Sequence, residues 1–419
     1  MSAVPPIERK YGRRRSGTAL WHMSRRAVAL SLEQIYAMKD NEALEFLVQA
    51  RFGGRETMRC PRCGSTGKHY WRPREKRWKC RGCDKTFSIT SGTLFSHRKL
   101  KLQEIIAGAL LWVNSAAGQP ALELKRHLNK TYSTAFVLQH KLREALVRGY
   151  NVGLLSGDLE VDGAHQSGRR SAEKRGRPQG SAFAAITADT PEEKLKEYLL
   201  TTTGQVNARG RRRRQGVIDP EFGRRLPKDR RIVYAVRKRA GGRGRGAIAS
   251  RVAVGLSEDK PIAEAVLRDF VAESESILNT DTSPAYMSAG GRFLDHRTVE
   301  HSKELVGPHG ENNNLVEELN WRMDRAEQGV YLNLEPKYLL DYAVETAFRA
   351  DTRRLSNGMQ LRIALHIALN VGPSRYWRGF TRGRHRTVEL LHPTSQTAPS
   401  SGPRKGQRPS SSANGRPPR

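Results

Sequence analysis

All four cysteines of this chain fall in two close pairs. Each pair has the spacing Cys-x-x-Cys: Cys60 with Cys63, and Cys80 with Cys83. Two such pairs, with residues 64–79 between them, have the ligand spacing of a closed tetrahedral zinc site. Because all four ligand positions would be thiolates, the predicted Zn²⁺ is structural and leaves no position open for a substrate.

The alternatives to zinc are two disulfides or four unrelated thiols. Disulfides need an oxidising compartment. Residues 1–17 are rich in Pro and Arg and lack the apolar core of a secretory signal. Gly64 and Gly82 are expected to give the two turns the backbone freedom they need.

The charge of the chain points to a polyanionic partner. It carries 74 Lys and Arg against 42 Asp and Glu, a formal net charge of +32. Self-repulsion of this size favours an anionic partner, with nucleic acid first and an acidic membrane surface second. The longest apolar stretch, around residues 105–113, is too short to span a bilayer. We therefore expect a soluble protein of a reducing compartment.

The first half of the chain reads as helices around the cysteine module. Helices are expected over residues 32–51, 102–117, 121–128 and 133–150, the last with Ser133 as its N-cap. The short gap at 129–132 favours a DNA-docking helix-turn-helix, with a plain helical hairpin as the alternative. The side chains expected on the outer face of 133–150 are Thr134, Gln139, Lys141 and Arg143.

From residue 157 onward the pattern changes to alternating strands and helices. Strands are expected at 159–164, 231–238, 247–254, 276–280 and 297–301, and helices at 261–272, 314–328, 336–354 and 359–370. The predicted fold class is α/β, with a mixed sheet in an RNase H-like core. The Arg-rich stretch 169–245 lies between the strand at 159–164 and the strand at 276–280. It is interpreted as a DNA clamp or as an arm that reaches a second strand, the alternative being a flexible solvated insertion.

Three carboxylates stand out in this basic half. Asp162 lies inside the first strand, Asp281 ends a short buried strand, and Glu317 lies on the helix that follows residues 312–314. An ionised Asp among apolar strand residues is costly unless it is paired or bound to metal. Two Mg²⁺ ions about 3.5–4 Å apart, held by such carboxylates, catalyse phosphodiester chemistry. Alternatively, Asp281 caps a turn and Glu317 forms an ion pair with Arg322 or Arg325.

Several motifs resemble the ISXO-type (ISXO-two-like) insertion-sequence transposases, which have a zinc-ribbon head and a DDE-type core. The head is matched by residues 60–64, 80–83 and 87–95, and the linking helices by 121–126, 134–136 and 140–145. The core is matched by 160–164, by 280–281 with Tyr286, by 314–317 with 322–330, and by 338–339 and 353–358.

The resemblance implies a transposase that cleaves and joins DNA strands with Mg²⁺ or Mn²⁺ held by Asp162, Asp281 and Glu317. It also implies that Asn314, one helical turn before Glu317, orients the nucleophile or a metal-bound water. Glu318 departs from the family pattern, and we favour Glu317 over it. Glu160 shares a strand face with Asp162 and is expected to be structural, although a role as an auxiliary ligand stays open. His301 precedes the third motif, as it does in relatives. Two roles are open for it: a contact to the scissile phosphate, or a hydrogen-bonded structural histidine.

The resemblance also sets the expected partners and location. These are double-stranded DNA, as transposon terminal inverted repeats and as target, and further copies of the chain on that DNA. No membrane partner is expected, and the location is the bacterial cytoplasm, with the nucleoid. The rival functions are a nuclease of the same fold that does not join strands and a catalytically inactive DNA-binding regulator.

Five segments are expected along the chain. They are a basic helical region (1–58), a zinc ribbon (59–97), a helix-turn-helix-like segment (98–150), the catalytic core (156–372, with a basic insertion at about 165–230) and a largely disordered basic tail (373–419).

Overall fold

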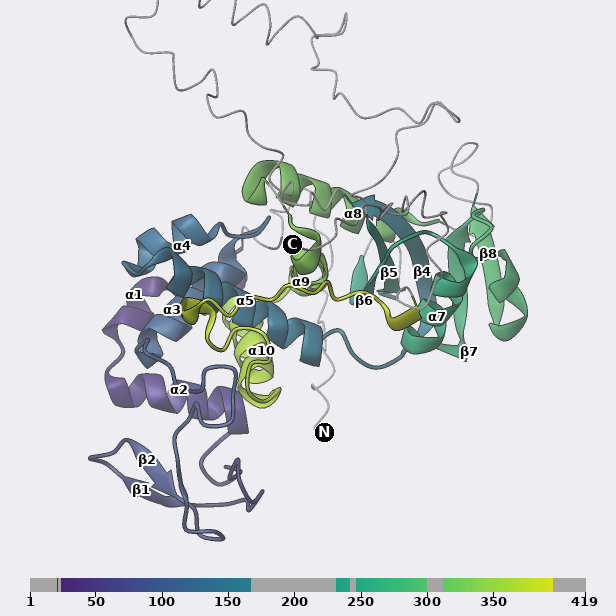
Figure 1. Cartoon of the computed structure of the whole chain (residues 1–419). Helices are drawn as coiled ribbons and strands as arrows, with labels where there is room; N and C mark the ends of the chain where they lie inside the picture. Colours follow the sequence, from purple (N-terminus) through teal and green to yellow (C-terminus); the bar gives the residue numbers. More distant parts are fainter. Residues whose placement is uncertain are drawn as a thin grey trace, which may run out of the picture.

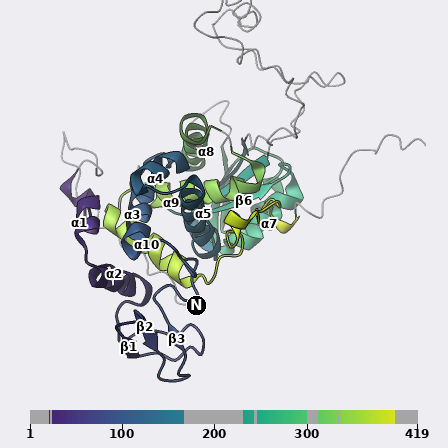
Figure 2. The same ribbon diagram turned by 60° about the vertical axis from the view of Figure 1, so that its left-hand side comes forward.

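A computed structural model describes residues 21, 24–166, 231–241, 246–299, 312–332 and 334–394. In this part of the chain, a helical body carries a small three-stranded sheet at one end, and a five-stranded sheet lies beside it (Figure 1). Figure 2 shows the small sheet next to α2 and α10, away from the larger sheet. The two sheets therefore belong to different parts of the fold.

The elements follow the order expected from the sequence pattern. The helices are α1 (Leu32–Ala37), α2 (Asp40–Phe52), α3 (Leu102–Asn114), α4 (Ala121–Leu128), α5 (Tyr132–Gly149), α7 (Lys260–Phe270), α8 (Asn314–Ala326), α9 (Leu339–Thr352) and α10 (Asn357–Asn370). The strands are β1 (Tyr70–Arg72), β2 (Arg77–Lys79), β3 (Thr86–Phe87), β4 (Leu155–Gln166), β5 (Arg231–Arg239), β6 (Ala247–Gly255), β7 (Val271–Asp281) and β8 (Asp295–Val299).

The five-stranded sheet is mixed, as predicted, and has the order β6-β5-β4-β7-β8. β4 lies at its centre and pairs antiparallel with β5 and parallel with β7. The outer pairs are antiparallel for β5 with β6 and parallel for β7 with β8. Parallel strands need a crossover, and α7 supplies the one between β6 and β7. The carboxyl ends of β4 and β7 consequently lie at the same edge of the sheet.

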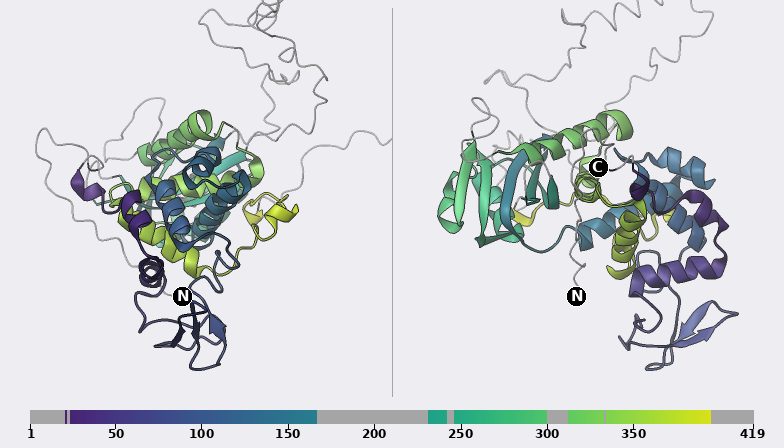
Figure 3. Two further views of the ribbon diagram at one scale, coloured as in Figure 1. Left: turned by 90° about the vertical axis from the view of Figure 1, so that its left-hand side faces the viewer. Right: turned by 180° about the vertical axis from the view of Figure 1, so that it is seen from behind.

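Different helices cover the two faces of this sheet. Along β5, Ile232, Tyr234 and Val236 join the apolar cluster formed with α7. The alternate residues Val233 and Ala235 join the cluster that contains α8 and α9. Because successive strand residues point to opposite faces, a strand covered on both sides is apolar along its length. Figure 3 shows the helical body and the sheet side by side from behind.

The helix α5 is the core of the helical body and packs against α3, α4, α9 and α10. The prediction that Gln139 and Arg143 face outward is wrong, because both side chains are at most 1 % exposed. Gln139 Nε2 donates to the carbonyl oxygen of Gln119 at 3.0 Å, and Arg143 Nε donates to Glu345 of α9 at 2.5 Å. The periodicity of α5 could not reveal these partners, since α9 lies some two hundred residues further along the chain.

The cap predicted for α5 is also wrong. The N-cap is Thr131, whose hydroxyl oxygen accepts the N–H of Thr134 at 3.3 Å, and Ser133 lies within the first turn. Thr and Ser are both good caps, so composition alone did not distinguish the two positions.

The C-terminal strap, residues 371–394, replaces the start of the expected disordered tail. Trp377 is 2 % exposed and its ring centroid lies 4.4 Å from that of His140. Arg386 pairs with Asp341 of α9, and His392 Nε2 lies 3.0 Å from Asp269 at the end of α7. The strap runs from the helical body to the five-stranded sheet, as the yellow trace in Figure 1 shows. Residues 395–419 lie outside the described residues.

The remaining secondary-structure expectations are confirmed with shifts at the ends of the elements. The strand expected at 276–280 begins earlier, at Val271, and the helix expected to reach residue 117 ends at Asn114. Nearly all of the expected basic insertion, from residue 167 onward, lies outside the described residues. Over the described ranges, none of the helices combines the length and the apolar composition needed to traverse a bilayer.

We predict that the variant Glu345→Ala destabilises the protein strongly. It removes the carboxylate that neutralises Arg143, whose side chain is 1 % exposed, and leaves a buried charge without its main partner. The expected loss is about 3–5 kcal/mol in the free energy of unfolding. Urea denaturation followed by tryptophan fluorescence measures it.

The matched control is Glu123→Ala, which removes an exposed carboxylate paired with His127 on α4. It should cost less than about 1 kcal/mol. Equal losses in the two variants would contradict a special role for the buried pair.

Candidate functional site

The four cysteines converge at one end of the small sheet. The Sγ atoms of Cys60 and Cys83 lie 3.9 Å apart, and those of Cys63 and Cys80 lie 3.6 Å apart. All four Sγ atoms are within 4.8 Å of one another. Zn–S bonds of about 2.3 Å in a tetrahedron place sulfur atoms about 3.8 Å apart. The arrangement fits a tetrahedral Zn²⁺, and the sulfur separations are far above the length of a disulfide bond.

Two similar turns present these thiols. In the first, the N–H of Gly64 donates to the carbonyl oxygen of Cys60 at 3.0 Å, and in the second Asp84 donates to Cys80 at 3.2 Å. Gly64 has a φ of 77°, as the turn requires, but the matching position in the second turn is Asp84, with a φ of 54°. Gly82 serves a different purpose: a Cβ there would lie 3.0 Å from Cβ of Ser65. It is needed because the two turns approach closely.

Arg51 fastens this module to the helical body. Its guanidinium donates to the carbonyl oxygens of Ile89 at 2.6 Å and Ser91 at 3.0 Å. Burial lowers the pKa of Arg51 to about 10, so the group stays charged at neutral pH. The module is thus held to α2 by charge-assisted hydrogen bonds.

Two of the predicted carboxylates lie side by side at one edge of the larger sheet. Glu160 of β4 is in register with Asn279 of the parallel strand β7. Asp162 and Asp281 follow these partners by two residues each, on neighbouring strands. Asp162 is half-buried, and its Oδ1 accepts the N–H of Gly163 at 2.8 Å. Asp281 Oδ1 accepts the N–H of Ser283 at 3.0 Å, so it also caps a turn, as the alternative interpretation expected.

Neither of these two carboxylates has a cationic partner in the described part of the chain. Burial, and then the neighbouring charge of Asp281, raise the pKa of Asp162 to about 7. The charges of Glu258 and Glu317 act in the same direction, while the hydrogen bond from Gly163 opposes them. Uncompensated carboxylates are unusual in so basic a protein, and such shifts are typical of functional sites.

Other buried carboxylates of the molecule are paired with arginine. Glu160 lies 2.7 Å from Arg239, and Asp351 lies 3.2 Å from Arg237. Glu160 also accepts the N–H of Leu315 at 2.7 Å and thereby caps the N-terminus of α8. Its carboxylate is therefore occupied by structural contacts.

The helix α8 presents its two adjacent glutamates differently. Glu317 lies in the first turn, is exposed, and is close enough to Asp162 for its charge to raise the pKa of that carboxyl. Glu318 lies 2.8 Å from Arg322 and 3.6 Å from Arg237, and also contacts Arg353. Arg322, one of the two arginines considered as partners of Glu317, pairs with Glu318.

Two further residues of the site were missed in the sequence. Glu258, between β6 and α7, is half-buried, and burial together with the charge of Asp281 raises its pKa. Asn313 is buried. With its side-chain amide assigned the orientation that satisfies both neighbouring groups, the amide donates to the carbonyl oxygen of Asn279 and accepts the N–H of Asp281, both at 3.2 Å. Asn313 is also the N-cap of α8, and its own carbonyl oxygen accepts the N–H of Glu317 at 3.1 Å.

Asn313 therefore ties the backbone of Asp281 to the turn that carries Glu317. The run of three asparagines at 312–314 was the available signal, but Asn314, the residue singled out in the sequence, is exposed. No local pattern marks Glu258, because only the crossover through α7 brings it to Asp281. His301 lies outside the described residues.

The carboxylates fit Mg²⁺ or Mn²⁺ by their chemistry, since these ions prefer hard oxygen donors. Within the ranges that the structure describes, the cysteines are the only group of three or more potential ligands whose atoms all lie within 4.8 Å of one another. Asp162, Asp281 and Glu317 are spread more widely than that. Mg²⁺ retains several waters and often contacts only one or two carboxylates directly, so a wider spread suits it.

Two family models match the chain. The ISXO2-like transposase domain matches residues 191–351, and the transposase zinc-ribbon domain matches residues 38–86. The second match contains all four cysteines, whereas the first contains Asp281 and Glu317 and begins after Asp162. The chain matches no curated protein and no solved structure.

The raised pKa of Asp162 predicts a pH-dependent effect of Asp162→Asn. The ordinary pKa of an aspartate is 3.8, so between about pH 4 and 7 the folded protein binds this proton more tightly than the unfolded chain does. Stability is therefore lost as the pH rises through that window. The variant removes this loss, and its gain in unfolding free energy should grow by about 1–2 kcal/mol from pH 5.5 to pH 8.

Urea denaturation without added divalent metal measures this gain. Asp295→Asn, an exposed carboxylate on β8, is the control and should shift stability by no more than about 0.5 kcal/mol at either pH. A gain for Asp162→Asn that is the same at both pH values would show that its carboxyl titrates normally.

Proposed function

Because the chain belongs to the ISXO2-like transposase family, we propose that it is a DDE-type transposase that binds transposon ends and catalyses metal-dependent DNA strand cleavage and strand transfer. The observation that carries the proposal is the meeting of Asp162 and Asp281 on adjacent parallel strands, beside the first turn of α8, with no cationic partner among the described residues for either. Such a site attracts divalent cations and, through them, phosphate.

The strand order supports an RNase H-like core. Three consecutive antiparallel strands, β4, β5 and β6, are extended on the other side of β4 by two parallel strands that follow a helical crossover. In this arrangement the central strand supplies Asp162, its parallel neighbour supplies Asp281, and a helix against the sheet supplies Glu317. These three side chains are the proposed catalytic set.

When bound there, Mg²⁺ or Mn²⁺ would make the attacking oxygen nucleophilic and stabilise the leaving oxygen. Asp162, Asp281 and Glu317 would hold the ions, and the charge that raises the pKa of Asp162 would then be compensated. Asn313 fixes the position of Asp281 relative to α8, and Glu160 fixes the start of α8 itself. Asn314, exposed one turn before Glu317, would contact the nucleophile or a metal-bound water.

The remaining parts of the proposal concern partners. The cysteine module would hold a structural Zn²⁺ and contact terminal inverted repeats, together with the segment around α4 and the exposed start of α5. Two ends must be processed together, which favours an oligomer on DNA. A DNA-processing enzyme of this family is expected in the bacterial cytoplasm with the nucleoid.

The test of the catalytic proposal is a strand-transfer assay on DNA that carries the element's ends. Wild type should give joined products with Mg²⁺ and none without divalent metal. Asp162→Asn, Asp281→Asn and Glu317→Gln should each lower the rate by at least about 100-fold, since each would lose several kcal/mol of charge stabilisation. Glu318→Gln is the matched control: it should reduce stability but leave the rate per folded molecule within a few-fold.

The products distinguish the rival functions. Nicked DNA without joining would favour a nuclease of the same fold. DNA binding without cleavage or joining, by wild type and variants alike, would favour an inactive regulator. A rate loss in Glu318→Gln as large as in Glu317→Gln would overturn the assignment of Glu317.

We also predict one zinc ion per chain. Elemental analysis of purified protein should give one equivalent, and Cys80→Ser should lose it, because three thiolates close a structural site poorly. The small sheet should then lose its protection from hydrogen exchange, while the five-stranded sheet keeps its own, since one of its faces packs in an apolar cluster that contains no residue of the cysteine module. Lys68→Ala, an exposed change in the same module, should retain the metal. Zinc-free protein that is two hydrogens lighter for each cysteine pair would indicate disulfides instead.

A further inference from the structure

The C-terminal strap lines a groove of about 1040 Å³ whose charge is entirely basic. The groove extends from Ser96 and His97, past α5, along strap residues 374–388. No Asp or Glu lines it. The Lys and Arg residues that line it are Lys141, Arg375, Arg378, Arg382, Arg384 and Arg386.

Most of these cations are available to a ligand. Arg386 is not, because it is buried against Asp341. By contrast, Arg375, Arg378, Arg382 and Arg384 are exposed, and no described residue forms an ion pair with them. Four unpaired charges within ten residues repel one another, so an anionic partner would stabilise this arrangement.

The backbone that carries these arginines is firmly held. Ser374 Oγ donates to Glu144 of α5 at 2.6 Å, and the N–H of Arg375 donates to the same carboxylate at 2.7 Å. Further along, Gly379 and Gly383 adopt φ values of 82° and 79° and enclose a helical turn. This turn projects Arg378, Arg382 and Arg384 from one ordered loop. A preorganised set of charges loses less entropy on binding than a flexible basic tail does.

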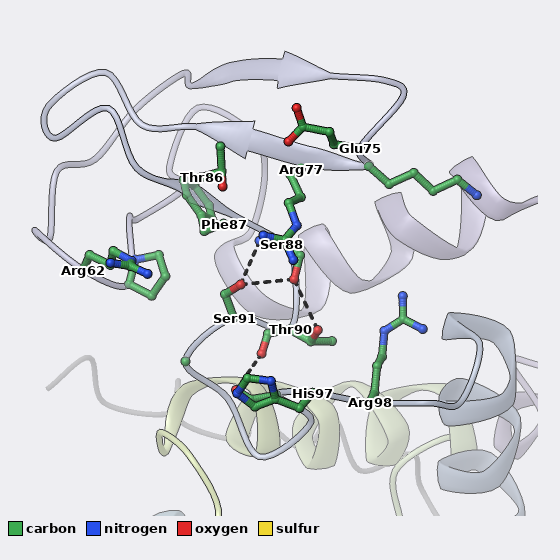
Figure 4. A pocket seen from close by; sticks show the side chains of 14 residues that line it. Arg62, Glu75, Arg77, Thr86, Phe87, Ser88, Thr90, Ser91, His97 and Arg98 are labelled. Atoms are coloured by element: carbon green, nitrogen blue, oxygen red, sulfur yellow. Dashed lines mark hydrogen bonds between the residues drawn. The ribbon is translucent and has the colours of Figure 1, made fainter.

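The groove continues into a second cavity on the cysteine module. Ser96 and His97 line both. The second cavity, of about 650 Å³, is lined by Arg77 of β2, by Arg98 and by the hydroxyls of Ser88 and Ser91 (Figure 4). Glu75 also lines it, and its carboxylate is paired with Arg72 at 2.9 Å. Arginine and hydroxyl groups are the usual donors to phosphate oxygens.

We propose that the strap and the cysteine module form one continuous track for the phosphate backbone of duplex DNA. The identity of that duplex as a transposon end rests on the proposed function. Duplex DNA carries one phosphate per about 1.7 Å of axis, which suits a row of fixed cations. Val388 is the one large apolar side chain that is mainly exposed along the strap groove. A membrane-bound surface would need a broader apolar face, so a lipid headgroup layer fits less well.

The test compares two triple variants of the full chain. Arg378→Ala/Arg382→Ala/Arg384→Ala removes three strap charges, and Arg25→Ala/Arg26→Ala/Arg268→Ala removes three exposed charges elsewhere. Fluorescence anisotropy measures binding to a 40-base-pair duplex with the element's end and to a random duplex of equal length, as a function of salt. Thermal unfolding of each variant checks that it is folded.

The strap variant should bind both duplexes at least about 10-fold more weakly at 150 mM salt. Its log–log salt slope should be smaller in magnitude by about 2–3, since each phosphate contact contributes about 0.9. The control should lose less than about 3-fold. Equal losses in the two variants, or none in the strap variant, would overturn the proposal. The proposal would also be overturned if the strap variant bound vesicles of anionic lipid more weakly than wild type while its binding to both duplexes was unchanged.

The binding result is independent of catalysis. Weaker binding by the strap variant, with no joined products from wild type, would retain the track and reject the transposase. Joined products from wild type, together with unchanged DNA binding by the strap variant, would support the transposase and reject the track.

Discussion

The architecture depends on three buried carboxylates of α9, each paired with an arginine from another part of the fold. Glu345 holds Arg143 of α5, Asp351 holds Arg237 of β5, and Asp341 holds Arg386 of the strap. All three pairs are almost fully buried. A charge buried without its partner would cost several kcal/mol, so these pairs penalise any other placement of the helical body, the sheet and the strap.

The same pairing separates the carboxylates that have arginine partners from the proposed metal ligands. Glu160 and Glu318 are engaged by Arg239 and Arg322, respectively. Asp162 and Asp281 are left to repel each other. Although other buried carboxylates are paired with arginine, Asp162 and Asp281 have no arginine partner among the described residues. The fold thus keeps negative charge on the neighbouring strands β4 and β7, where a divalent cation would reduce the repulsion.

In the proposed function, the five-stranded sheet and the strap have different roles. The five-stranded sheet and α8 would hold the chemistry, while the cysteine module and the strap would hold the DNA backbone. The strap also touches both bodies, through Trp377 on the helical side and through His392, whose N–H donates to the carbonyl oxygen of Val254 in β6. DNA bound along the strap would therefore be registered against the catalytic edge through fixed contacts instead of a flexible linker.

The sequence by itself determined the local features of this protein. Period-two and period-3.6 patterns gave nearly every helix and strand, and the spacing of Cys60, Cys63, Cys80 and Cys83 predicted that they would meet. The predictions of these elements and of the cysteine cluster succeeded because neighbours along the chain set them. Asp162, inside its strand, and Asp281, at the end of its strand, were singled out by the same kind of pattern. The structure brings them onto neighbouring strands, and their catalytic role stays a prediction.

Only the tertiary structure decided which polar residues are buried and with whom. The sequence predicted Arg143 to be on the surface, but in the structure it is buried and paired with Glu345. Residues 373–394 were predicted to be a disordered tail, because their few apolar side chains pack on helices that are distant in the sequence. Glu258 and Asn313 joined the site in the same way. Their partners lie far apart in the sequence, and a favourable contact between distant residues leaves no period in either segment.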